Sequence, residues 1–101
     1  TAGEKVYPEE VEEALKRHSN VYDSLVVGVE DQKFGQKVIA VVSSDSPSLD
    51  ADELVNFART HLSGYKLPKE VIFVDEVKRA PNGKANYKWA KETADKYMKS
   101  L

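Results

Sequence analysis

The chain has 101 residues, 41% of them apolar and 32% charged, which is the size and composition of one ordinary globular domain. Its 15 basic and 17 acidic side chains give a net charge of −2, which argues against a dedicated nucleic-acid-binding domain. It has no cysteine, so disulfides and thiolate metal sites are excluded, and no apolar run approaches the ~18 residues of a membrane span.

The first predicted element is a helix from Pro8 to His18. Proline is favoured in the first turn of a helix, where its missing N–H would be unpaired in any case. Acidic residues gather at the start and basic residues at the end, which suits the helix dipole. Val11, Ala14 and Leu15 form an apolar stripe, and the charged residues between them, Glu12 included, are predicted to form a solvated helix face.

Three short apolar runs are typical of buried strands. The first two, Leu25 to Val29 and Val38 to Ser43, are separated by a polar stretch, Glu30 to Lys37, that contains a glycine. Such closely spaced runs are predicted to pair as an antiparallel hairpin. The third predicted strand is Val71 to Asp75.

Two more helices complete the predicted order. Asp50, with Glu53 three residues later, is a capping-box pattern, and Gly64 is predicted to stop that helix. Asn86 is the predicted cap of a last helix, which carries Trp89 on its apolar side. The order helix, strand, strand, helix, strand, helix predicts an α+β domain with a small three-stranded, largely antiparallel sheet and helices packed on it.

Two basic segments are the candidates for binding an anion, and residue patterns alone leave each open. Lys78 to Lys84 is a turn built by proline, asparagine and glycine, with Lys84 just past the glycine. A lysine there can reach a phosphate or carboxylate, or it can be an ordinary surface residue. Gly64 to Lys69 offers two lysines and a tyrosine to an anion, or it simply ends a helix and enters a strand.

Several motifs in order resemble the C-terminal domain of the acyl-adenylate-forming enzymes, which include acyl-CoA synthetases and peptide-synthetase adenylation domains. The resemblance covers essentially the whole chain, as one domain over residues 1–101. It rests on Gly3-Glu4-Lys5-Val6-Tyr7-Pro8-Glu9-Glu10-Val11-Glu12, on Val26-Val27-Gly28-Val29-Glu30-Asp31 with Phe34-Gly35, on Tyr65-Lys66-Leu67-Pro68, on Val71-Ile72-Phe73-Val74-Asp75-Glu76 and on Pro81-Asn82-Gly83-Lys84. The sequence departs from the family pattern at Ala80, where a threonine is common, and after Lys84.

The resemblance implies one part of an ATP-dependent acid–CoA ligase, most similar to fatty-acyl-CoA synthetases and expected in the cytoplasm. A carboxylate attacks ATP to give an acyl-adenylate, and coenzyme A then takes the acyl group. Lys84 occupies the position of the family's adenylation lysine, and the small domain rotates between the two steps. The partner is the large N-terminal domain of the same chain, which binds ATP and the acid and is expected to hold Mg²⁺. No metal is expected in the small domain, and without its partner the small domain is expected to be inactive.

Further positions are carried over from the same resemblance as contacts to coenzyme A or the nucleotide. They are Ala2, Gly3, Glu4, Lys5, Phe34, Arg59, Leu67, Pro68 and Lys69. Two alternatives stay open: the same domain from a peptide-synthetase module or a fatty-acyl-AMP ligase, and a non-catalytic interaction domain. The acyl chain length cannot be predicted, because the acyl pocket belongs to the large domain.

Overall fold

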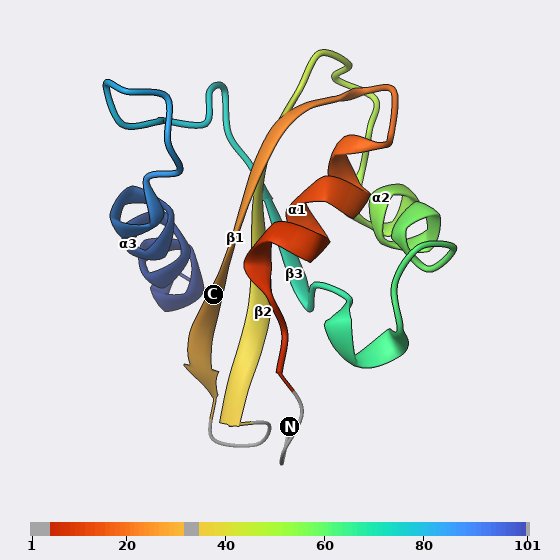
Figure 1. Ribbon diagram of the computed structural model, residues 1–101, viewed down its shortest axis with the longest axis horizontal. Helices are drawn as coiled ribbons and strands as arrows, with labels where there is room; N and C mark the ends of the chain where they lie inside the picture. Colours follow the sequence, from red (N-terminus) through yellow and green to blue (C-terminus); the bar gives the residue numbers. More distant parts are fainter. Residues whose placement is uncertain (1–4, 32–34, 101) are drawn as a thin grey trace.

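The computed structural model describes residues 5–31 and 35–100. Its elements are α1 (Pro8–Lys16), β1 (Val21–Asp31), β2 (Gly35–Ser44), α2 (Ala51–Ala58), the 3₁₀ turn η1 (Gly64–Lys66), β3 (Glu70–Phe73) and α3 (Tyr87–Lys99). Figure 1 shows α3 on one side of the sheet and α1 and α2 on the other. The predicted α+β class and the predicted order of helices and strands are confirmed.

The sheet has the order β1-β2-β3, with β2 in the centre. β1 pairs with β2 antiparallel from Val21–Ser44 to Asp31–Gly35, whereas β3 pairs with β2 parallel only over the short span from Ile39–Glu70 to Val42–Phe73. A parallel pair needs a crossover connection, and α2 lies within it. The sheet is therefore mixed but largely antiparallel, as predicted.

Each face of the sheet has its own hydrophobic core, because successive side chains of a strand point to opposite faces. The core beneath α1 and α2 includes Leu15, Val26, Val42, Leu54 and Ala58. The core beneath α3 includes Leu25, Ile39, Val41, Ile72, Val77, Ala90 and Ala94. All three layers are thus fixed by apolar packing on both sides of one small sheet.

Several predicted boundaries are wrong. The stretch Glu30 to Lys37, predicted as a connection, is mostly strand, because β1 continues to Asp31 and β2 begins at Gly35. Backbone N–H and C=O groups can pair whatever their side chains are. Polar residues that face water can therefore continue a strand. α2 ends at Ala58, where the Thr60 hydroxyl donates to the Phe57 carbonyl, and Gly64 instead begins η1.

Glu12 corrects the prediction of a solvated charged face on α1. Its side chain is only 6% exposed, and its Oε2 atom accepts hydrogen bonds from the Val26 N–H and the Tyr87 hydroxyl, both at 2.9 Å. β1 is an edge strand, so the Val26 N–H has no strand to pair with. Because α1 covers this N–H, it needs an acceptor from within the protein. Burial raises the pKa of Glu12, and the two hydrogen bonds only partly offset that rise. One carboxylate therefore joins α1, β1 and the start of α3.

Candidate functional site

The segment between β3 and α3 contains a tight hairpin turn that ends at Lys84. The Gly83 N–H donates to the Ala80 carbonyl at 2.8 Å, and the Ala80 N–H donates to the Lys84 carbonyl at 3.0 Å. Arg79 and Ala85 form an isolated antiparallel bridge at its base. A three-residue loop of this kind uses a type I turn followed by one left-handed residue, and Gly83 has a φ of 83°. The predicted tight turn is confirmed.

Each residue of the turn has a separate structural role. Pro81 sets the backbone angle required at the second turn position. The Asn82 Oδ1 atom accepts a hydrogen bond from the Lys84 N–H at 3.1 Å. Glycine adopts the left-handed conformation at Gly83 without the steric cost that a Cβ would bring. The local sequence therefore dictates where the Lys84 backbone lies.

The Lys84 side chain projects from this turn into solvent. Within residues 5–31 and 35–100, no acidic group lies within ion-pair distance of its ammonium group. The nearby Lys78, by contrast, is paired with Glu76 at 3.0 Å. Lys84 therefore presents a compact positive charge that a partner's anion can meet.

An ion pair ties the turn to the sheet. Arg79 donates from Nε to Asp23 Oδ2 at 2.8 Å and from Nη2 to Asp23 Oδ1 at 2.7 Å, and its Nη1 donates to the Gly83 carbonyl at 3.3 Å. Burial alone would raise the pKa of Asp23. The hydrogen bonds from Arg79 and from the Ser24 N–H outweigh burial, so the pKa of Asp23 lies below its ordinary value.

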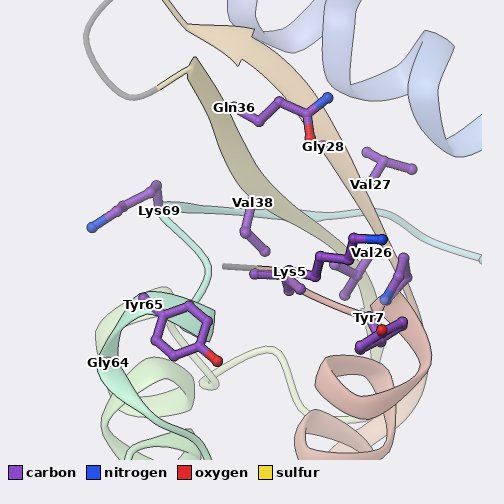
Figure 2. A pocket seen from close by; sticks show the side chains of 12 residues that line it. Lys5, Tyr7, Val26, Val27, Gly28, Gln36, Val38, Gly64, Tyr65 and Lys69 are labelled. Carbon is purple, nitrogen blue, oxygen red and sulfur yellow. The ribbon is translucent and has the colours of Figure 1, made fainter. Parts of the chain in front are cut away.

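A pocket of about 570 Å³ lies at the other end of the domain. Figure 2 shows that three separate segments build it: the residues leading into α1, the paired strands β1 and β2, and the segment around η1. The lining residues are Lys5, Val6, Tyr7, Pro8, Val26, Val27, Gly28, Gln36, Val38, Gly64, Tyr65 and Lys69. In Figure 1 the segment leading into α1 is at the bottom and the turn that carries Lys84 is at the top left.

The model of the AMP-binding enzyme C-terminal domain matches residues 10–84 of this sequence. The chain belongs to this family. It is 56% identical over 91% of its length to a 3-oxocholest-4-en-26-oate–CoA ligase of Rhodococcus rhodochrous. It is 55% identical over 94% of its length to a medium/long-chain-fatty-acid–CoA/3-oxocholest-4-en-26-oate–CoA ligase of Mycobacterium tuberculosis.

A solved structure of a Mycobacterium tuberculosis fatty acyl CoA synthetase superposes on this AMP-binding enzyme C-terminal domain with a TM-score of 0.85. The sequence identity is 34%, and the match covers 92% of this chain and 18% of that one. The chain spans only 17% and 18% of the two ligases to which it is similar. Both ligases are therefore much longer than this chain, which corresponds to a small part of each.

The domain's structure brings some of the predicted contact residues together and separates others. Lys5 and Lys69 both line the pocket. Leu67 and Pro68 are buried beside it and are not part of its lining. Arg59 follows α2, away from the pocket lining, and its Nε donates to the Asn56 side chain at 3.3 Å. The remaining predicted positions, Ala2, Gly3, Glu4 and Phe34, lie outside the described residues.

Sequence reasoning missed pocket residues such as Tyr7 and Gly28, although it had singled out Tyr65 in the segment from Gly64 to Lys69. Tyr7 and Tyr65 flank the pocket and are 61% and 38% exposed, which is unusual for such large rings. A Cβ atom at Gly28 would come within 3.0 Å of Gln36 Oε1, so the glycine leaves room for that side chain. The available signal was a tyrosine within two residues of a lysine in both segments that line the pocket, Lys5-Val6-Tyr7 and Tyr65-Lys66.

Over the described part of the chain, no group of three or more histidine, cysteine, aspartate or glutamate residues is placed to hold a metal ion. None of the helices in residues 5–31 and 35–100 is long and apolar enough to cross a membrane.

Proposed function

We propose that the chain is the mobile C-terminal domain of an ATP-dependent acyl-CoA ligase, with Lys84 as its adenylation residue. The observation that carries the proposal is the placement of Lys84: an exposed cation on a hydrogen-bonded turn, with no acidic partner among the described residues. Negative charge spreads over carboxylate and phosphate oxygens when the acid attacks ATP. A cation held in a fixed position stabilises that charge.

The pocket with Lys5 and Lys69 supports a role in the second step. Coenzyme A carries phosphates that cations bind and an adenine ring that can stack on an exposed tyrosine such as Tyr65. Lys84 and this pocket lie at opposite ends of the domain. One rotation of the domain would therefore move Lys84 away from the active centre and bring the pocket to it. The proposal also includes Arg59, Leu67 and Pro68 as further contacts to coenzyme A or the nucleotide.

The relatives favour coenzyme A over a carrier protein as acyl acceptor, because both are named as CoA ligases. Their names also point to two kinds of acid, a medium- or long-chain fatty acid and a steroid side-chain acid. We extend both kinds to the enzyme that contains this domain. ATP and coenzyme A are cytoplasmic substrates, so we place the ligase in the cytoplasm, with Mg²⁺ held by its N-terminal domain.

The test uses the full-length protein with ATP, Mg²⁺, coenzyme A and each of three acids: dodecanoate, palmitate and 3-oxocholest-4-en-26-oate. The two half-reactions are measured separately, as pyrophosphate release and as thioester formation from supplied acyl-adenylate. Lys84→Ala is expected to slow the first by about 100- to 1,000-fold, the loss typical of removing one electrostatic group, and to leave the second intact. Normal pyrophosphate release by Lys84→Ala would refute the assignment, and no product from any acid would favour a non-catalytic domain.

A further inference from the structure

The Arg79 guanidinium is the one described group that contacts both β1 and the backbone immediately before Lys84. It binds both carboxylate oxygens of Asp23, at 2.7 Å and 2.8 Å, and donates to the Gly83 carbonyl at 3.3 Å. A guanidinium is planar and presents its donors in a rigid fork. The direction in which the turn leaves the sheet is therefore tied to the position of Asp23.

The turn's own hydrogen bonds do not fix that direction. They join Ala80 to Gly83 and Lys84, and Asn82 to Lys84, so all of them lie inside the loop. No helix or strand lies between the end of β3 and the start of α3. Without an external tether, a loop with only internal hydrogen bonds can swing as a rigid unit about its base.

We propose that Arg79, held by Asp23, is a positioning residue for Lys84. The inference rests on the proposed function and deepens it, because it names what sets the reach of the adenylation lysine. Misplacing a reacting or stabilising group by about 1 Å can cost about 100-fold in rate. Release of the turn from β1 therefore slows adenylation even though Lys84 itself is unchanged.

This role differs from a general contribution to folding. The side chains of Arg79 and Asp23 are 31% and 17% exposed. A two-pronged pair can also stabilise the fold, so the unfolding temperature of each variant is measured beside its rates. The pocket with Lys5 and Lys69 is at the other end of the domain and does not include either residue. The second half-reaction therefore does not depend on the pair.

The experiment uses the full-length ligase and the acid from the three above that it adenylates fastest. Arg79→Ala and Asp23→Ala are each expected to lower the rate of pyrophosphate release about 10- to 100-fold, with thioester formation from supplied acyl-adenylate unchanged. Arg79→Lys keeps the charge but loses the two-pronged contact, so an intermediate loss is expected. Lys78→Ala is the matched control, because Lys78 is a cation of the same loop that pairs with Glu76, and the rate of this variant is expected to be unchanged.

The decisive measurement adds Arg79→Ala to Lys84→Ala. A residue that acts only through Lys84 has nothing left to position, so the double variant is expected to be no slower than Lys84→Ala alone. A further loss in the double variant, or unchanged adenylation in Arg79→Ala, would overturn the positioning role. Neither outcome touches the proposed function, which depends on Lys84→Ala itself. An equal fall in both half-reactions, with a lower unfolding temperature, would show a structural role and also overturn the inference.

Discussion

The turn around Lys84 and the pocket around Tyr65 are built in different ways, and we propose that each binds an anion. The turn consists of consecutive residues, is shaped by its own hydrogen bonds and presents one point charge. The pocket draws on three segments far apart in the sequence and presents a shape with cations at its edge. A step that needs charge at one point uses a local motif, whereas recognition of a large ligand needs the assembled fold.

The largest effect on stability is expected at Glu12. Its carboxylate links α1, which follows the pocket segment, to α3, which follows the turn with Lys84. Glu12→Ala leaves the Val26 N–H and the Tyr87 hydroxyl without their acceptor. We expect a loss of about 2 kcal/mol in the free energy of unfolding, measured by urea denaturation of the 101-residue chain. Glu13→Ala is the control, since its exposed pair with Lys16 contributes at most about 0.5 kcal/mol. Equal losses in the two variants would contradict the link.

A charge change in the pocket is expected to impair the second half-reaction and spare the first, the reverse of what is expected for Lys84→Ala. Lys69→Glu places a negative charge at the pocket edge, so in the full-length ligase we expect the KM for coenzyme A to rise about tenfold, or about 1.4 kcal/mol. Pyrophosphate release should stay unchanged. Lys91→Glu on α3, outside the pocket lining, controls for the change in net charge. Slower adenylation with an unchanged KM for coenzyme A would remove the functional distinction between the two regions.

A pair of glycines compares the backbones of the two regions. Gly83 has a φ of 83°, whereas Gly64 beside the pocket is not left-handed, and a Cβ atom meets nothing within 4 Å at either position. Gly83→Ala is expected to cost about 1 kcal/mol of stability through conformation alone. Gly64→Ala is expected to change it by less than about 0.5 kcal/mol, by the same urea measurement. Similar costs at both sites would show that the left-handed backbone is not what shapes the turn.

The smallest effect is a pH dependence. Folding raises the pKa of Glu12 above 4.5, so the folded protein binds this proton more tightly than the unfolded chain does. The free energy of unfolding therefore increases as the pH falls through that raised pKa. Glu12→Gln keeps an oxygen acceptor and removes the titration. Between about pH 7 and pH 5, wild-type stability should therefore rise relative to the variant by less than about 1 kcal/mol. Asp23 is present in both proteins, so the pH dependence from its lowered pKa cancels in the comparison. Parallel curves would contradict the raised pKa.

Features set by neighbouring residues were predictable from the sequence. Asp50 and Asn86 each accept the capping hydrogen bond expected of them, from the N–H groups of Glu53 and Trp89. The turn that ends at Lys84 was predictable because proline, asparagine and glycine restrict their own backbones. The second half of the capping box does not form, because the Glu53 carboxylate contacts His18 at 3.1 Å instead, across 35 residues.

Features set by distant partners were not predictable. Glu12 looks like any other acid in an acidic helix start. It becomes an interior group through partners 14 and 75 residues later, the Val26 N–H and the Tyr87 hydroxyl. The Arg79–Asp23 pair spans 56 residues. The parallel direction of β3 and the placement of Lys5 and Lys69 around one pocket depend equally on how the whole chain packs. Pairwise partners of this kind leave no periodic signal in one sequence.

The contact between Glu12 and Val26 also affects whether another chain can pair with the edge of the sheet. β1 is the open edge of the sheet and contains an apolar run, Leu25 to Val29, that another chain could extend. By accepting the hydrogen bond from Val26, the carboxylate occupies a donor at the centre of that edge, and α1 covers the strand around it. A negative charge placed there also repels an incoming strand's carbonyls. The same side chain that joins three elements therefore leaves this edge one fewer free donor for pairing with another chain.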